Sequence, residues 1–93
     1  MAVPLRLTAS GVVLNAPCRV YYVSVKGGSD AATVALANQG TSGGTELFGW
    51  GAATTVYSSA NVNGFIDFPV ACYATITGTS PVINITNGPI PNG

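Results

Sequence analysis

The residues that could carry acid–base, thiol or metal chemistry are few in this chain and lie far apart in the sequence. It has no histidine, and its only thiols and carboxylates are Cys18, Cys72, Asp30, Glu46 and Asp67. Without histidine, neither a Ser-His-Asp triad nor a histidine metal site can form, and two distant cysteines do not supply a thiolate zinc site. Three carboxylates in separate segments do not match the carboxylate pair of a glycosidase. We therefore expect a non-enzymatic protein with no catalytic residue, no metal and no cofactor.

Both cysteines lie in runs that are typical of β-strands, residues 18–21 and 70–73. A reducing cytosol favours free, buried thiols over a disulfide in such runs. If the two cysteines were paired, the long loop between them would give roughly 4 kcal/mol of stability, provided that their strands are neighbours.

The remaining motifs that could carry chemistry are weak. Residues 40–44 are rich in glycine but lack the lysine and the helix of a phosphate-binding loop. Residues 84–86 (Asn-Ile-Thr) match a glycosylation sequon without a recognisable export signal, so we interpret them as a chance match. Core packing, subunit contact and ligand stacking all remain open for four aromatic residues, Tyr22, Phe48, Trp50 and Tyr57.

The composition is unusual in its low charge. Only 6% of the 93 residues are charged and the net charge is zero, against about 25% charged residues in an ordinary domain. A surface of Thr, Ser, Asn, Gly and apolar side chains suits a subunit of an assembly, and it offers no basic footprint for nucleic acid. No apolar run approaches the ~18 residues of a membrane span, and no export signal is recognisable. We expect one domain that binds neither nucleic acid nor membrane.

The longest run without Gly or Pro that favours β-structure is residues 18–26, in which Tyr and Val dominate. Both faces of this strand begin apolar, and only its second half alternates cleanly. This pattern predicts that the first half is covered on its second face by a terminal segment or another subunit, with Val20 or Tyr22 at the contact.

Turns rich in Gly, Pro, Asn and Ser recur about every ten residues, and no segment has a helical period. The pattern predicts an all-β fold: a single small β-sandwich or jelly roll of about eight short antiparallel strands, spanning residues 1–93. Residues 5–14 predict an edge strand split near Ser10 and Gly11. Prolines at positions 4, 89 and 91 predict extended terminal arms at residues 1–7 and 87–93. The residues expected to face the core are Tyr21, Val23, Val25, Val34, Leu36, Leu47, Val56, Ile66, Phe68, Tyr73, Ile76 and either Ile83 or Ile85.

Four segments, residues 19–25, 35–45, 64–68 and 72–77, together resemble small virion structural proteins of tailed bacteriophages, cyanophages among them. The resemblance covers most of residues 12–86. The chain departs from it at residues 61–63, where a turn containing proline is expected, and at residues 86–89, which replace a simple strand end. The resemblance implies a structural role on the virion, as a head decoration or cement protein, and brings no catalytic residue with it.

Low charge and this resemblance together predict a capsid decoration protein that binds and stabilises the lattice of the major capsid protein. We expect a homo-oligomer, with a trimer favoured, that is made in the bacterial cytoplasm and located on the outer capsid surface. The alternatives are a tail or fibre module that contacts the host, and a carbohydrate-binding module that uses Trp50 and Tyr57. The residues expected at the interface are Val3, Leu5, Leu7, Val20, Tyr22, Trp50 and Ile90.

Overall fold

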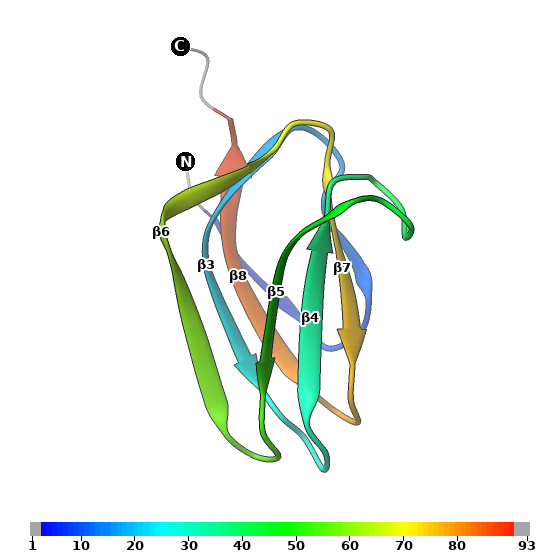
Figure 1. Ribbon diagram of the computed structural model, residues 1–93, viewed down its shortest axis with the longest axis vertical. Helices are drawn as coiled ribbons and strands as arrows, with labels where there is room; N and C mark the ends of the chain where they lie inside the picture. The colour runs from blue at the N-terminus through cyan, green and yellow to red at the C-terminus, as the bar shows by residue number, and fades with distance from the viewer. Residues whose placement is uncertain (1–2, 91–93) are drawn as a thin grey trace.

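The structure, a computed structural model, describes the backbone of residues 3–90 and the side chains of residues 4–59 and 65–90. Within these residues it contains eight strands and no helix (Figure 1). No helix in this part of the chain is long and apolar enough to cross a membrane. The strands are β1 (Val3–Leu7), β2 (Gly11–Leu14), β3 (Cys18–Lys26), β4 (Ala32–Ala37), β5 (Glu46–Ala52), β6 (Tyr57–Phe68), β7 (Cys72–Thr77) and β8 (Val82–Pro89).

The strands form two four-stranded antiparallel sheets, with the strand orders β1-β8-β3-β6 and β2-β7-β4-β5. Each strand of the first half of the chain pairs with a counterpart in the second half: β1 with β8, β2 with β7, β3 with β6 and β4 with β5. The chain is therefore one long hairpin whose two arms are wound together around a single interior. This is the jelly-roll arrangement, and the predicted all-β sandwich or jelly roll is confirmed.

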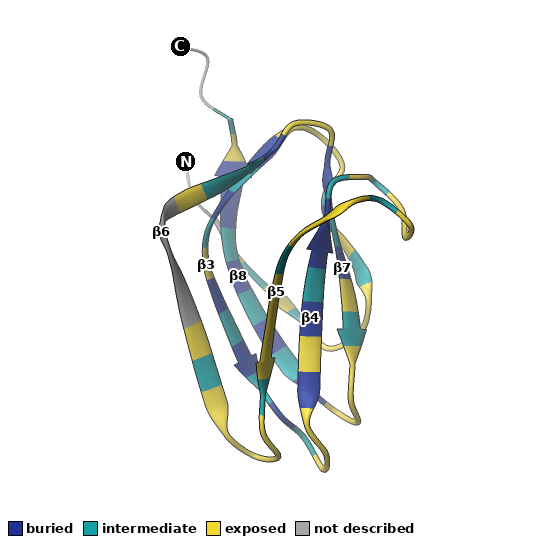
Figure 2. Cartoon of the chain, in the orientation of Figure 1, coloured by how far each residue is buried: buried dark blue, intermediate teal, exposed yellow. Residues whose placement is uncertain are grey.

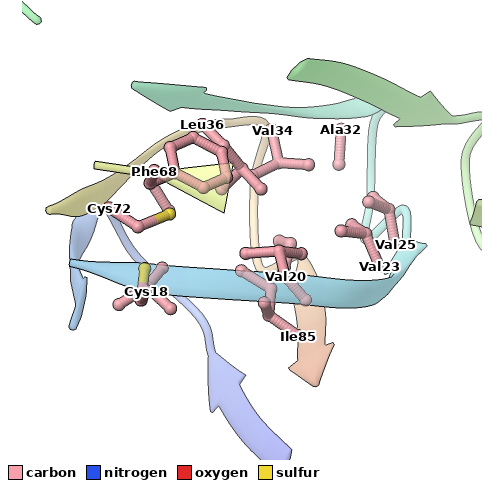
Figure 3. Packing of buried hydrophobic residues seen from close by; sticks show 13 residues of the cluster. Cys18, Val20, Val23, Val25, Ala32, Val34, Leu36, Phe68, Cys72 and Ile85 are labelled. Carbon is pink, nitrogen blue, oxygen red and sulfur yellow. The ribbon is translucent and has the colours of Figure 1, made fainter. Parts of the chain in front are cut away.

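The core lies between the two sheets and is built from short apolar side chains (Figures 2 and 3). Figure 3 shows residues of β3 across the interior from residues of β4. The core positions that were predicted correctly are Val23, Val25, Val34, Leu36, Phe68 and both Ile83 and Ile85. Ile66 and Ile76 pack against this core and are partly buried.

Four predicted core residues are wrong, and the strand register gives the reason. Phe48 lies opposite the buried Leu36 and so faces inward, whereas Leu47 is the extra residue where the β4–β5 register shifts, and it is 42% exposed. Val56 lies in the turn after β5 and is 50% exposed. Tyr21 and Tyr73 are only half-buried, since each lies on the outer face of its sheet.

A β-bulge in β3 explains why this strand begins apolar on both faces. Val20 pairs with Asn87 and Tyr22 with Thr86, so β3 advances by two residues while β8 advances by one. The extra residue reverses the alternation: Cys18 and Val20 face the core before the bulge, and Val23 and Val25 face it after. The prediction that Val20 is covered by another subunit or a terminal segment is therefore wrong, because Val20 is 0% exposed in the core of the sandwich.

The predicted split edge strand is confirmed, and its halves belong to different sheets. β1 is an edge strand of one sheet and β2 an edge strand of the other. The Ser10 hydroxyl lies at the break, where it accepts a hydrogen bond from the Ile76 amide (2.8 Å) and donates one to the Ile76 carbonyl (3.3 Å). This side chain therefore fixes the point at which the chain leaves the first sheet.

The predicted terminal arms are wrong for residues 3–7 and 87–89, because both segments are paired strands. Residues 3–7 form β1, and β8 continues to Pro89, which lies opposite Cys18. Both prolines occupy positions that a sheet tolerates: Pro4 is on an edge strand, and Pro89 is the last residue of its strand. Residues 1, 2 and 91–93 of the predicted arms lie outside the described residues.

The connection between β3 and β4 holds one end of the sandwich together. The Gly27 amide donates to the Val56 carbonyl (3.2 Å), and the Ser29 amide donates to the Thr79 carbonyl (3.2 Å). A side chain at Gly28 would collide with the backbone carbonyl oxygens of Thr79 and Ser80. Glycine is therefore needed here because backbone approaches backbone, and three turns pack at this end of the molecule.

Candidate functional site

The described residues contain no group of side chains arranged for catalysis. Among them there is no pocket and no cluster of three or more potential metal ligands. The three carboxylates lie in separate places: Asp30 accepts a hydrogen bond from the Thr79 amide, Glu46 lies beside Gly49, and Asp67 pairs with Arg19. The candidate site is therefore a surface, and the two outer faces of the sandwich are the surfaces to compare.

The outer face of the β1-β8-β3-β6 sheet, which we name the charged face, carries all three cationic side chains of the chain. Arg6 lies opposite Asn84, Arg19 opposite Asp67, and Lys26 opposite Tyr57. Each lies outward because its neighbours along the strand face the core. One of the three carboxylates lies here, so the face carries a surplus of positive charge although the chain as a whole is neutral.

Arg19 is the organising residue of the charged face. Its Nε and Nη2 atoms donate to the two carboxylate oxygens of Asp67 at 2.7 and 3.1 Å, and its Cζ atom lies 3.6 Å from the centre of the Phe65 ring. The hydrogen bonds from Arg19 hold the pKa of Asp67 below its ordinary value. The bidentate geometry fixes the guanidinium in one orientation, so three side chains from β3 and β6 form a rigid unit.

Three further aromatic residues, all tyrosines, lie on the charged face. The Lys26 Nζ atom is 5.3 Å from the centre of the Tyr57 ring, and Tyr57 is 63% exposed. The bulge in β3 places Tyr21 and Tyr22 consecutively on this side, with Tyr22 40% exposed. The face therefore combines cations, aromatic rings and hydroxyl groups without a cavity.

The outer face of the other sheet is uncharged over three of its strands. We name it the neutral face and define it by the outward residues of β2, β7 and β4. Its centre consists of paired small side chains, in which Thr33 lies opposite Thr77 and Ala35 opposite Thr75. The Thr33 and Thr77 hydroxyl groups hydrogen-bond to each other. The residues of the neutral face are Val12, Thr33, Ala35, Tyr73, Thr75 and Thr77.

The structure does not bring the predicted interface residues together in one place. Val20 is in the core, and Leu5 and Leu7 pack against the core from β1, so these side chains are directed into the molecule. Tyr22 is exposed on the charged face, and Ile90 is half-buried after the end of β8. The side chain of Val3 lies outside the described part of the chain.

Trp50 lies away from the other predicted contacts, on the edge strand β5. It pairs with the buried Val34 and so faces the inner side of its sheet, where it is 37% exposed. Its indole N–H donates to the Ser58 hydroxyl (3.0 Å), and its ring stacks with Phe48 at 6.2 Å. Tyr57 faces outward on the opposite sheet, so Trp50 and Tyr57 do not form a shared platform for a sugar.

Neither the Arg19–Asp67–Phe65 unit nor the threonine rows of the neutral face were predicted from the sequence. The outward alternation of Phe65 and Asp67 was visible in the sequence, but nothing local indicated that this segment lies beside Arg19. The pairing follows from the register of β3 with β6, which joins residues 48 positions apart.

The two cysteines are free and buried, as the sequence predicted, and they come from opposite sheets (Figure 3). A hydrogen bond with Cys18, together with burial, raises the pKa of the Cys72 thiol far above its ordinary value. The same hydrogen bond lowers the pKa of the Cys18 thiol. Both side chains are fully buried in the core cluster, out of reach of any reagent, so the pair serves as core packing.

Comparisons of this chain with protein-family models, with curated proteins and with solved structures find no match. The fold and the chemistry of the two faces are therefore what indicates a function.

Proposed function

We propose that this chain is a structural virion protein, a capsid decoration or cement protein that binds the lattice of the major capsid protein on the outside of a phage head. The jelly-roll topology supports this role, because viral capsid domains are among the proteins that use it. Lectins and cupins use it as well, so the fold alone does not select the function. The choice between them rests on the surface.

The neutral face is the observation that carries the proposal. It presents threonine, alanine, valine and tyrosine side chains and no charge on β2, β7 and β4. Such a face can be buried against another neutral protein surface without the large cost of removing unpaired ions from water. Threonine hydroxyl groups can then exchange water for hydrogen bonds with the partner.

The size of the neutral face also fits a protein that acts in many copies. Three strands spaced by about 4.8 Å, with a length of about six residues, cover roughly 300 Å². A standard interface buries about 800 Å² on each partner. One copy therefore binds weakly, and firm attachment requires an oligomer whose faces engage the lattice together.

A tail or fibre module that contacts the host is the second candidate, and the exposed aromatic residues of the charged face favour it. Tyr22, Tyr57 and Phe65 are between 40% and 63% exposed, and exposed aromatics are enriched in binding surfaces. A carbohydrate-binding module has less support, because cations lie over the rings of Phe65 and Tyr57 and Trp50 faces another direction.

Immunoelectron microscopy of virions from the source, with an antibody against this chain, tests the proposal. A decoration protein gives label distributed over the whole head. Label confined to the tail would replace the proposal with the second candidate, and virions without label would refute both.

A further inference from the structure

The outer edge of β5 is the least protected of the four sheet edges. Natural proteins protect exposed edges with prolines, charges, bulges or short strands, because an open edge can pair with another chain. β1 carries Pro4 and Arg6, and β2 has only four residues and an irregular register. The β6 ladder is interrupted between Val20 and Tyr22, and β6 contains Asp67. Each of these three edges therefore has protection.

β5 lacks such protection over most of its length. It has seven residues and pairs only with β4 among the strands of the described chain. Its one irregularity is at Leu47, so residues 48–52 continue in regular register and contain neither a charge nor a proline. Their backbone groups on the side away from β4 form a short row that can accept another strand.

Apolar side chains lie along this edge. Trp50, 37% exposed, lies on the inner side beside Phe48, and Leu47, 42% exposed, lies at the start of the strand. A strand added at the edge would cover these side chains, in addition to pairing the backbone. The edge therefore offers hydrogen bonds and apolar contacts together.

We propose that β5 pairs in antiparallel fashion with β5 of a second copy, giving a two-fold dimer with one continuous eight-stranded sheet. The sequence of β5 is compatible with antiparallel pairing to a second copy of the same strand. A two-fold axis at Gly49 places Phe48 opposite Trp50 of the partner subunit and the small Gly49 residues opposite each other. The only charged residue of β5 is Glu46. In this register the two Glu46 carboxylates lie about 20 Å apart, beyond the ~8 Å over which charges interact at physiological salt.

The dimer would also enlarge the neutral face. A two-fold axis perpendicular to the sheet leaves the neutral faces of both copies on the same side, flanking the two β5 strands. Their combined area is roughly 600 Å², closer to the ~800 Å² that a standard interface buries on one partner. An isologous contact closes after two copies, so this edge makes a dimer where the sequence led us to expect a trimer. The dimer itself does not depend on the virion role, because it is a property of the purified chain.

Sedimentation equilibrium of the purified full-length chain over a range of concentrations tests the dimer. Trp50 is the only tryptophan, so its emission reports directly on the proposed contact. We expect a monomer–dimer equilibrium and a red shift of the emission on dilution. Gly49→Asp places two carboxylates opposite each other, each beside the Glu46 carboxylate of its own chain, and should raise the dissociation constant about ten-fold or more. Thr75→Asp adds the same charge to the neutral face away from the edge and should leave dimerisation unchanged.

A second edge variant separates loss of pairing from loss of folding. Leu47→Lys alters an exposed side chain, so the monomer should keep its circular dichroism spectrum and its melting temperature while dimerisation weakens. A wild-type protein that remains monomeric at the highest concentration it tolerates would overturn the proposal. So would a trimer, or dimerisation that survives in both edge variants. An edge variant that loses the dimer but stays bound to virions would show that the decoration role does not require the dimer.

Discussion

The charged face and the neutral face are the two outer surfaces of one sandwich, and they differ in nearly everything except backbone geometry. The charged face holds all three cations of the chain with Asp67, Phe65 and exposed tyrosines. The neutral face holds threonine and alanine in matched rows. A net charge of zero therefore describes a polarised molecule rather than a uniformly neutral one. The composition gives the number of charged residues, whereas the fold determines the face on which each of them lies.

Along β3, side chains alternate between the core and the charged face. A deletion that exchanges the two sets of side chains is expected to have the largest effect on folding. Deleting Ser24 turns Val25 outward and Lys26 inward, and burying an unpaired ammonium costs several kcal/mol. We expect this variant not to fold, as judged by circular dichroism and thermal denaturation.

Deleting Tyr21 is the matched control, because it removes the extra residue of the bulge. Val20 and Tyr22 would then follow the same regular register with β8 as their neighbours, and the residues facing the core would be unchanged. We expect this variant to fold. If both deletions behave alike, the bulge does not set the phase of the strand.

The next largest effect concerns binding rather than folding. Thr75→Asp places a carboxylate at the centre of the neutral face, where burial against the capsid lattice would remove it from water. We expect affinity for virions stripped of this protein to fall about ten-fold or more. The free energy of unfolding of the isolated chain should change by about 0.5 kcal/mol or less. Cosedimentation with the particles measures the first quantity and urea denaturation the second.

Arg6→Glu on the charged face is the counterpart of this substitution. It changes the charge of an exposed residue on the opposite side of the sandwich, and we expect binding to remain within about two-fold of wild type. If Arg6→Glu weakens binding more than Thr75→Asp, the roles of the two faces are reversed.

A smaller effect is expected from the ion pair of the charged face. Since Arg19 lowers the pKa of Asp67 in the folded state, the pair contributes stability above the unfolded-state pKa of about 3.9. That contribution is lost as the pH falls through the lower folded-state pKa. Asp67→Asn should therefore lower the melting temperature at pH 7, and the difference from wild type should shrink below about pH 4. If the difference in melting temperature stays constant from pH 7 to below pH 4, the charge of Asp67 does not contribute to stability.

The smallest effect is expected at Lys26. Its ammonium group is 5.3 Å from the centre of the exposed Tyr57 ring, and such contacts are worth about 0.5–1 kcal/mol at exposed sites. Lys26→Gln should reduce the free energy of unfolding by this amount or less in urea denaturation. A larger loss would show that the charged face also stabilises the fold.

The strands and the fold class followed from the sequence because they depend on local alternation and turn residues. The division into sheets also left a local sign, the interruption at Ser10 and Gly11. The reversal of the inward and outward alternation in β3 left no such sign. A bulge and a strand covered on both faces give the same apolar run at Val20 and Tyr22. Leu47 and Phe48 were equally ambiguous until the pairing with Leu36 was known.

The two faces were hidden from the sequence for a related reason. The threonines of β4 and β7 are 44 residues apart at Thr33 and Thr77, and each is unremarkable in its own strand. The prolines caused the opposite error, in which a pairing that exists was not predicted. Pro4 and Pro89 indicated unpaired arms, but a sheet edge and a strand end accept proline without losing a necessary hydrogen bond.

The nested pairing of the strands also determines when the chain can fold. The β4–β5 hairpin joins neighbours in sequence, whereas Val3 pairs with Asn87, so the outermost ladder cannot form until residue 87 has been made. Because loop-closure entropy must be overcome before such distant contacts form, β-rich domains of this kind fold in milliseconds to seconds. On a ribosome that adds about 5–20 residues per second, the apolar strand β3 is exposed for seconds before β6 and β8 emerge to cover its two edges. We expect folding to begin at the β4–β5 hairpin and to finish with the docking of β1 against β8.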